Sequence, residues 1–161
     1  MAKDVRYWDA CAFSGFFNEE ADKIAECESV LKAAQDGHIL IVTSALTLAE
    51  VLFVKNGPRI DPEKRSVIEK FFKADYISVR NVTRYVGELS RDVFWDFGIK
   101  PKDAVHVATA AFSKIGTLNT FDGDLIGKSG IVVLGQTLKI CRPHHVQQLP
   151  LTLQQPKPQG G

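Results

Sequence analysis

The chain has few cysteines and almost no net charge, and both shortages narrow the function classes open to it. Its three cysteines, Cys11, Cys27 and Cys141, are widely spaced and form no CxxC pair. An odd, unpaired set of this kind argues against a disulfide framework or a zinc site and indicates reduced thiols. The net charge is only +1 over 161 residues, so no overall field attracts nucleic acid or a cationic partner. Any contact with nucleic acid must therefore come from a local patch.

The sequence also lacks the apolar segments that membranes and secretion require. No apolar run approaches the roughly 20 residues needed to span a bilayer, and Met1–Arg6 lacks the basic-then-apolar order of a signal peptide. We therefore expect a cytoplasmic protein with no membrane association. Hydrophobic residues make up 45% of the chain, which is enough for one ordinary core. We expect a single domain over 1–146 and a disordered, proline-rich tail over 147–161.

Hydrophobic patterning and helix caps predict strands that alternate with helices. The predicted strands are Val5–Trp8, His38–Val42, Tyr76–Val79, Thr117–Asn119 and Ile131–Leu134. The predicted helices run from Asn18 to Gly37, over Ala45–Val54 (capped by Thr43 or Ser44), from Asp61 to about Lys73, over Val82–Phe97, and from Pro101 onward. This alternation predicts an α/β fold, a three-layer α/β/α sandwich with a mainly parallel central sheet. It does not distinguish a flavodoxin-like from a Rossmann-like strand order.

One acid stands at the head of an otherwise apolar predicted helix. Asp103 precedes Ala104–Phe112, a run without a charged side chain, so this helix is expected to be buried. At helical spacing Asp103 lies on the same face as Val107 and Ala111. A buried carboxylate without a partner costs several kcal/mol. Asp103 therefore calls for a metal ion, a cationic partner or a shifted pKa.

Further acids follow the predicted strands, at the edge where open parallel sheets bind ligands. These acids are Asp9 after the first strand, Glu50 on the helix after the second, and Asp122 and Asp124 after Thr117–Asn119. Taken singly, each has an ordinary explanation: a turn residue, a solvated ion pair, or an acid favoured at a helix N-terminus. These explanations weaken when all the acids fall on one side of one sheet.

A cluster of carboxylates predicts a hard divalent cation. Like charges raise one another's pKa, so clustered acids need compensation to stay ionised. Oxygen ligands without thiols or paired histidines favour Mg²⁺ or Mn²⁺ over zinc. An acidic Mg²⁺ site suits phosphodiester cleavage by water that the metal activates, with one acid acting as a base.

Four segments of the chain resemble, in order, the characteristic segments of PIN-domain nucleases. They are Tyr7–Cys11, Thr43–Glu50, Asp103–Ala110 and Thr120–Leu125. Each segment alone is a weak match, whereas the ordered set is specific, and it extends from about Val5 to Pro143. Within the family the chain looks most like VapC-type toxins of bacterial and archaeal toxin–antitoxin pairs.

The resemblance implies a PIN-like fold and a Mg²⁺-dependent endoribonuclease that cleaves structured RNA, commonly tRNA or rRNA. It also implies a homodimer and inhibition by a small antitoxin protein. Residue by residue, Asp9, Glu50, Asp103 and Asp122 match the family's acidic quartet, whose members are catalytic and hold the metal. Asp124 matches a frequent fifth acid.

The sequence departs from the family at the two positions after the first acid. The family usually has Thr or Ser there, followed by Asn or Ser, whereas this chain has Ala10 and Cys11. Thr120 and Ser44 remain as hydroxyls that are expected to position water or a carboxylate. Because all the acids are present, we do not interpret the departure as inactivation.

Other polar residues have both an ordinary and a functional interpretation. Arg84, Arg91, Lys100 and Lys102 flank the Asp103 helix and are candidates for RNA phosphate contacts, although solvated surfaces explain them almost as well. His106 is expected to pack inside the helix with its ring satisfied; the alternative is a hydrogen bond to Asp103 one turn earlier.

Two rival functions stay open at this point. The first is a PIN-like module that binds RNA or a protein without cleaving, and Ala10 is its support. The second is an α/β phosphatase that uses Asp122-Gly123-Asp124. The phosphatase is weakened because the chain has neither an acid–Gly–Thr arrangement nor a glycine loop that cradles phosphate.

Overall fold

A computed structural model describes residues 3–51 and 62–145. The elements in chain order are β1 (Asp4–Trp8), α1 (Ala10–Phe17), α2 (Ile24–Gln35), β2 (Ile39–Ser44), α3 (Ala45–Glu50), α4 (Pro62–Phe71), β3 (Ile77–Arg80), α5 (Arg84–Phe97), α6 (Pro101–Phe112), β4 (Thr117–Asn119), α7 (Gly123–Ile126), β5 (Val132–Val133), β6 (Gln136–Thr137) and β7 (Lys139–Cys141). The predicted tail over 147–161 lies outside the described residues. None of the helices described is long and apolar enough to cross a membrane.

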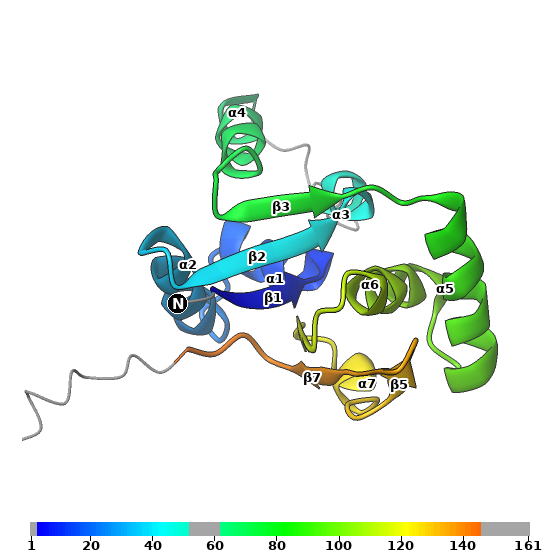
Figure 1. The fold of residues 1–161 in the computed structure, drawn as a ribbon. Coiled ribbons are helices and arrows are strands. Elements are labelled where there is room, and N and C mark those ends of the chain that lie inside the picture. The colour runs from blue at the N-terminus through cyan, green and yellow to red at the C-terminus, as the bar shows by residue number, and fades with distance from the viewer. Residues whose placement is uncertain (1–2, 52–61, 146–161) are drawn as a thin grey trace, which may run out of the picture.

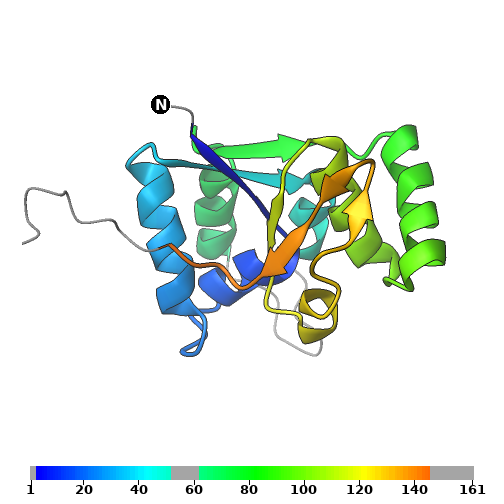
Figure 2. The ribbon, with the colours of Figure 1, turned by 60° about the horizontal axis from the view of Figure 1, so that its bottom comes forward.

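The central sheet has five strands in the order β3-β2-β1-β4-β7, and all neighbouring strands are parallel. Helices α1, α2 and α4 cover one face, and α5 and α6 cover the other (Figures 1 and 2). The predicted α/β/α sandwich is confirmed. After β1 the chain builds outward through β2 and β3, then returns to place β4 on the other side of β1. The carboxyl ends of β1 and β4 therefore form the switch point where open α/β sheets bind ligands.

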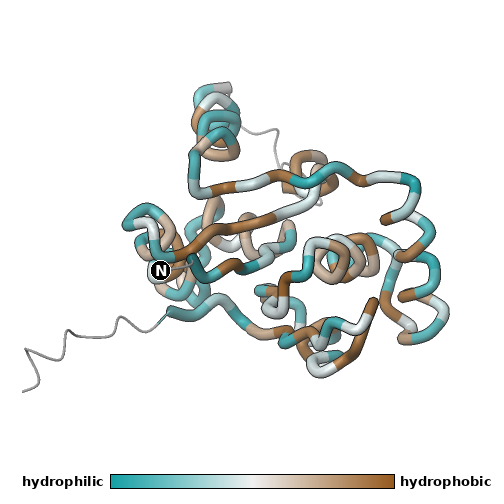
Figure 3. The backbone as a smooth tube through the Cα atoms, viewed as in Figure 1, coloured by the Kyte–Doolittle hydropathy of each residue, from teal (hydrophilic) through white to brown (hydrophobic). Residues whose placement is uncertain are grey.

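The strands are apolar because they are buried on both faces. Tyr7, Val42 and Leu118 pack towards α5 and α6, whereas Trp8 and Ile41 pack towards α1 and α2. Strand β2 runs through the middle of the molecule as a mostly apolar segment (Figure 3). A core on each side of the sheet holds the carboxyl ends of the strands rigidly, which any site at that edge requires.

The prediction that a helix begins at Asn18 is wrong. Helix α1 occupies Ala10–Phe17, and Asn18 ends it as the C-cap. Glu19 then adopts a positive φ of 50° and the chain turns before α2 begins at Ile24. Asn is common at helix C-termini as well as N-termini, so its presence alone does not decide which end it marks.

The prediction of Ile131–Leu134 as the last core strand is also wrong. Val132–Val133 pairs antiparallel with Gln136–Thr137 in a separate hairpin. Leu134 and Gly135 both have positive φ, 51° and 72°, as tight two-residue hairpin turns require. The fifth strand of the sheet is Lys139–Cys141, which pairs with β4. This strand is too short for a hydrophobic pattern to mark it.

The helix ends near the carboxyl edge of the sheet follow the predicted caps. The hydroxyl of Ser44 accepts a hydrogen bond from the Leu46 N–H at 3.1 Å and begins α3. Helix α5 ends at Gly98, whose φ of 67° is the left-handed conformation that favours glycine. Helix α6 begins at Pro101, and its Ala104, Val107 and Ala111 are buried as predicted.

Candidate functional site

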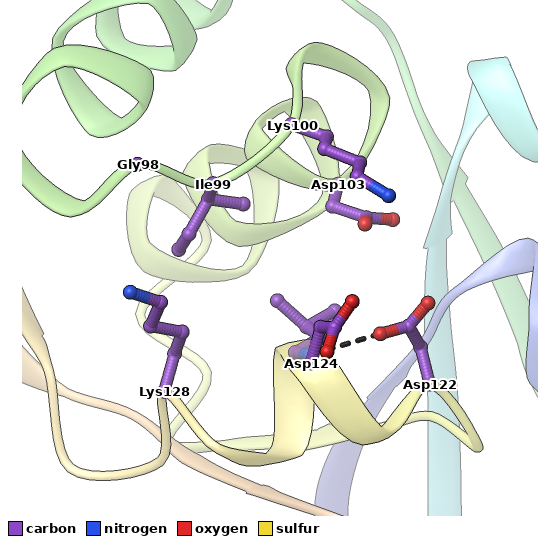
Figure 4. Close-up of a pocket in the computed structure, with 8 residues that line it drawn as sticks. Gly98, Ile99, Lys100, Asp103, Asp122, Asp124 and Lys128 are labelled. Atoms are coloured by element: carbon purple, nitrogen blue, oxygen red, sulfur yellow. Dashed lines mark hydrogen bonds between the residues drawn. The ribbon is translucent and has the colours of Figure 1, made fainter.

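A pocket of about 290 Å³ lies between the start of α6 and helix α7. Its lining residues are Gly98, Ile99, Lys100, Asp103, Asp122, Asp124, Leu125 and Lys128. Asp103 extends into the pocket from α6, and the carboxylates of Asp122 and Asp124 face it from α7 (Figure 4). Acids therefore line the pocket from two facing sides, and two separate segments each contribute a lysine to its lining.

Asp103 lies in the first turn of α6 and is half-buried. No side chain caps this helix, so the partial positive charge of its N-terminus is directed toward the pocket edge. Burial raises the pKa of Asp103, and the negative charges of Asp122 and Glu50 raise it further. The positive charge of Lys100 lowers the pKa of Asp103. The shift indicates that the Asp103 carboxyl is close enough to Asp122 and Glu50 for their charges to act on it.

Asp9 follows β1 directly and is almost fully buried, with 2% of its surface exposed. Its Oδ1 accepts a hydrogen bond from the Ala12 N–H at 3.0 Å and so caps α1. Burial raises the pKa of Asp9 to about 6, and the charge of Asp103 contributes to the rise. His106, the Thr120 hydroxyl and the Ala12 N–H oppose it. Asp9 therefore carries a charge at neutral pH in a place that penalises charge.

Glu50 is the last residue of α3, and its carboxylate turns toward α6. Its Oε1 lies 3.4 Å from Nε2 of His106. Both atoms are buried, and neither has a hydrogen-bond partner among the residues described. The other ring nitrogen of His106 shares a 2.7 Å hydrogen bond with the Tyr7 hydroxyl. The prediction of a fully satisfied His106 ring is therefore wrong at Nε2, and the ring's described hydrogen bond is to Tyr7 instead of Asp103.

Asp122 is held by two hydrogen bonds at the start of α7. Its Oδ1 accepts from the Leu125 N–H at 2.9 Å, and its own N–H donates to the Thr120 hydroxyl at 3.1 Å. One carboxylate oxygen is thus used as a helix cap, which orients the other. Thr120 is fully buried and supports Asp122 through the backbone. The Ser44 hydroxyl serves as the cap of α3, so its described contact lies within that helix.

The donor set suits a hard divalent cation in chemistry and charge. All the acids offer oxygen, the ligand atom that Mg²⁺ and Mn²⁺ prefer, and the Glu50 Oε1 is buried without a partner. Within the ranges 3–51 and 62–145, no three His, Cys, Asp or Glu side chains already stand in a metal-binding arrangement. A cation would therefore have to draw the carboxylates closer together.

The structure places the four basic residues predicted to contact RNA in different surroundings. Lys100 lines the pocket, whereas Lys102 is exposed in the first turn of α6. Arg84 pairs with Glu88 and Arg91 lies over the Trp95 ring, both on exposed parts of α5. Sequence analysis missed Lys128, which lines the pocket from the turn after α7. Nothing local distinguishes this lysine, since only the position of α7 brings it to the pocket.

Comparison with known protein families shows to which family the chain belongs. The family model described as the PIN domain matches residues 6–129. This chain belongs to the PIN domain family. The match covers the central strands, the site edge and all five acids, as the resemblance of the four segments predicts.

Solved structures of PIN-domain toxins share the fold at low sequence identity. Mycobacterium tuberculosis VapC20, described as a sarcin-ricin loop cleaving toxin, is 17% identical with a TM-score of 0.63, over 80% of this chain and 98% of VapC20. A toxin–antitoxin complex from Klebsiella pneumoniae is 16% identical with a TM-score of 0.58, over 88% and 99% of the two chains. VapBC2 from Rickettsia felis, bound to a promoter DNA fragment, has the same identity and TM-score over 84% and 98%. No curated protein matches the chain.

At the two positions after Asp9, this PIN domain has residues that differ from those usual in the family. Ala10 is buried at the start of α1, and Cys11 is a half-buried free thiol. Burial and the charge of Asp9 raise the pKa of the Cys11 thiol. Without a bound metal, Cys11 therefore stays protonated at neutral pH and does not supply a thiolate nucleophile.

Proposed function

We propose that this PIN-domain protein is an endoribonuclease that depends on Mg²⁺ or Mn²⁺ and is the toxin of a toxin–antitoxin pair. The observation that carries the proposal is that carboxylates from α6 and from the start of α7, those of Asp103, Asp122 and Asp124, line one pocket. Asp103 feels the charges of Asp122 and Glu50, and Asp9 feels that of Asp103. Burying like charges together is unfavourable unless something compensates them, and a divalent cation does so.

Each acid has a role that follows from its position. Asp103 and Asp122 face each other across the pocket (Figure 4) and would hold the cation between α6 and α7. Asp9 lies deeper, where its Oδ1 caps α1, and its carboxylate would add negative charge beside the cation. Glu50 approaches from α3, and Asp124 extends from the rim of the pocket. When bound, the cation would supply positive charge for the phosphate in the transition state and acidify an attacking water.

Structured RNA is the proposed substrate and a small antitoxin the proposed partner. VapC20 is described as cleaving the sarcin-ricin loop, and the Klebsiella and Rickettsia relatives were solved as toxin–antitoxin assemblies. The description of VapC20 supports a structured RNA as the substrate, and tRNA or rRNA is the class that the resemblance of the four segments implies. A homodimer is supported by an apolar patch where Tyr85 of α5 and Phe112 of α6 are both about half exposed, with ring centroids 5.2 Å apart.

The purified chain is expected to cleave tRNA or rRNA fragments in Mg²⁺ or Mn²⁺ and to stop when EDTA removes the cation. The charge that balances the phosphate is then lost. Gel analysis of the RNA products measures this, and light scattering of the same preparation tests for the dimer. Binding of RNA without cleavage in either metal would favour the rival binding module. Release of free phosphate from small monoesters would favour the phosphatase.

Lys128 is expected to bind RNA phosphate beside the acids, together with Lys100. Lys128 lines the same pocket as the acids, with its ammonium on the side away from them (Figure 4). Lys128→Gln should raise KM for RNA several-fold with little change in kcat, and reduce the slope of log KM against log salt by about 1. The matched control is Lys114→Gln, since Lys114 is exposed just beyond the far end of α6. An equal effect of the two substitutions would contradict a specific role for Lys128.

A further inference from the structure

Two buried side chains and the partly buried Glu50 form a chain of contacts between β1, α6 and α3. The Tyr7 hydroxyl on β1 lies 2.7 Å from Nδ1 of His106 on α6. Nε2 of His106 lies 3.4 Å from Oε1 of Glu50 on α3. Tyr7 is fully buried and His106 is 1% exposed. The contacts therefore join three elements that come together only in the folded sheet.

The two facing atoms of His106 and Glu50 lack other partners. In the part of the chain that the structure describes, neither Nε2 nor Oε1 forms a hydrogen bond. An N–H···O hydrogen bond is usually about 2.7–3.2 Å long, so their separation of 3.4 Å is just outside the range. Because buried polar groups are normally paired, each atom is the natural partner of the other. A small rotation of the Glu50 side chain closes the gap.

The contact with Tyr7 bears on which ring nitrogen of His106 carries the proton. The Tyr7 phenol carries one proton that it can donate, and Nδ1 of His106 lies 2.7 Å from its oxygen. A phenol that donates to Nδ1 leaves the ring proton of a neutral imidazole on Nε2. The N–H is then on the ring nitrogen that lies 3.4 Å from the Glu50 Oε1. The opposite tautomer would place two acceptors against each other at this contact.

We propose that His106 is a positioning residue, which holds the Glu50 carboxylate toward the pocket through its Nε2–H, and that Tyr7 selects the tautomer that allows this. The inference rests on the proposed function in that Glu50 serves a cation-binding site. Partners of this kind orient a ligand without touching the metal, and their loss commonly weakens metal binding or activity by about 10- to 100-fold.

Nuclear magnetic resonance of the metal-free protein tests the tautomer without any reaction. The chain has four histidines, so loss of one set of ring signals in His106→Gln assigns His106. Long-range ¹H–¹⁵N spectra are expected to show Nε2 protonated and Nδ1 bare in the wild type. Tyr7→Phe should give a mixture of tautomers. A proton on Nδ1 in the wild type, with or without one on Nε2, would overturn the proposal.

Substitution of His106 tests the positioning role directly. His106→Leu should weaken binding of Mn²⁺ alone, measured by calorimetry, and lower kcat by about 10- to 100-fold with KM for RNA unchanged. His106→Gln retains an N–H donor and should recover most of both losses. Equal losses in the two variants, or none in either, would overturn the proposal. If His106→Leu does not fold, Tyr7→Phe replaces it, with smaller losses expected in the same quantities.

Ser90→Ala is the matched control for disturbing the core. Ser90 is buried on α5, and its hydroxyl donates to the Val86 carbonyl, so its loss removes a buried polar group away from Glu50. This variant should leave Mn²⁺ binding and kcat unchanged. The outcomes separate the two proposals. Mn²⁺ binding without RNA cleavage by the wild type contradicts the proposed function alone, whereas wild-type behaviour of His106→Leu contradicts the positioning role alone.

Discussion

Asp103→Asn is expected to reduce metal-dependent RNA cleavage by at least about 1000-fold, which corresponds to a loss of about 4 kcal/mol of transition-state stabilisation. Asparagine keeps the size of the side chain and its place in the first turn of α6, but it removes the negative charge that faces Asp122 across the pocket. The cleavage rate at saturating Mg²⁺ measures the effect. Expression in a bacterial host gives a second measurement, because the wild type should arrest growth and the variant should not.

The stability of Asp103→Asn separates a lost site from a lost fold. Burial and the charges of Asp122 and Glu50 disfavour ionised Asp103, so the metal-free variant should melt at or above the wild-type temperature. Asp96→Asn is the matched control, since Asp96 is an exposed acid on α5 outside the pocket. It should cleave RNA like the wild type. Wild-type cleavage by Asp103→Asn would exclude this residue from the site.

The metal-free protein is expected to lose stability as pH rises, because of Asp9. The folded pKa of Asp9 is about 6 against an unfolded value of 3.8, so folding favours the protonated carboxyl. This contribution is fully present below about pH 4 and is lost as pH rises through about 6. Between about pH 4 and neutral pH, the shift lowers the free energy of unfolding by about 3 kcal/mol. Urea unfolding between about pH 4 and pH 7 gives the free energy of unfolding of the wild type and of Asp9→Asn. The change with pH in the difference between these two free energies measures the contribution of Asp9.

Asp9→Asn is a suitable partner in this comparison because asparagine is also a good N-cap. The variant keeps the hydrogen bond that the Ala12 N–H donates to residue 9 and loses the titration. Addition of Mn²⁺ near neutral pH should raise the free energy of unfolding of the wild type more than that of Asp9→Asn, since the cation compensates the buried charge. Parallel stability curves for the two proteins across this pH range would show that the folded state does not raise the pKa of Asp9.

The elements that sequence analysis missed are those without a distinct local pattern. Helix α1 follows Asp9 through small and aromatic residues that lack clear amphipathic spacing. Strand β7 has three residues and a single fully buried side chain, Ile140. Its place beside β4 depends on the hairpin of β5 and β6, which redirects the chain. Neither helix α1 nor the pairing of β7 with β4 can be inferred from a short stretch of sequence.

The sequence by itself determined the alternation of strands and helices, the membership in the PIN family and the delivery of acids to one sheet edge. These follow from local order, because Asp9 and Asp122 come just after strands and Asp103 lies in the first turn of a buried helix. Only the tertiary structure decided how deeply Asp9 is buried, that Lys128 reaches the pocket, and that His106 stands between Tyr7 and Glu50. Tyr7 and His106 are 99 positions apart. Burial and electrostatic coupling depend on distances between such remote segments, and packing alone sets those distances.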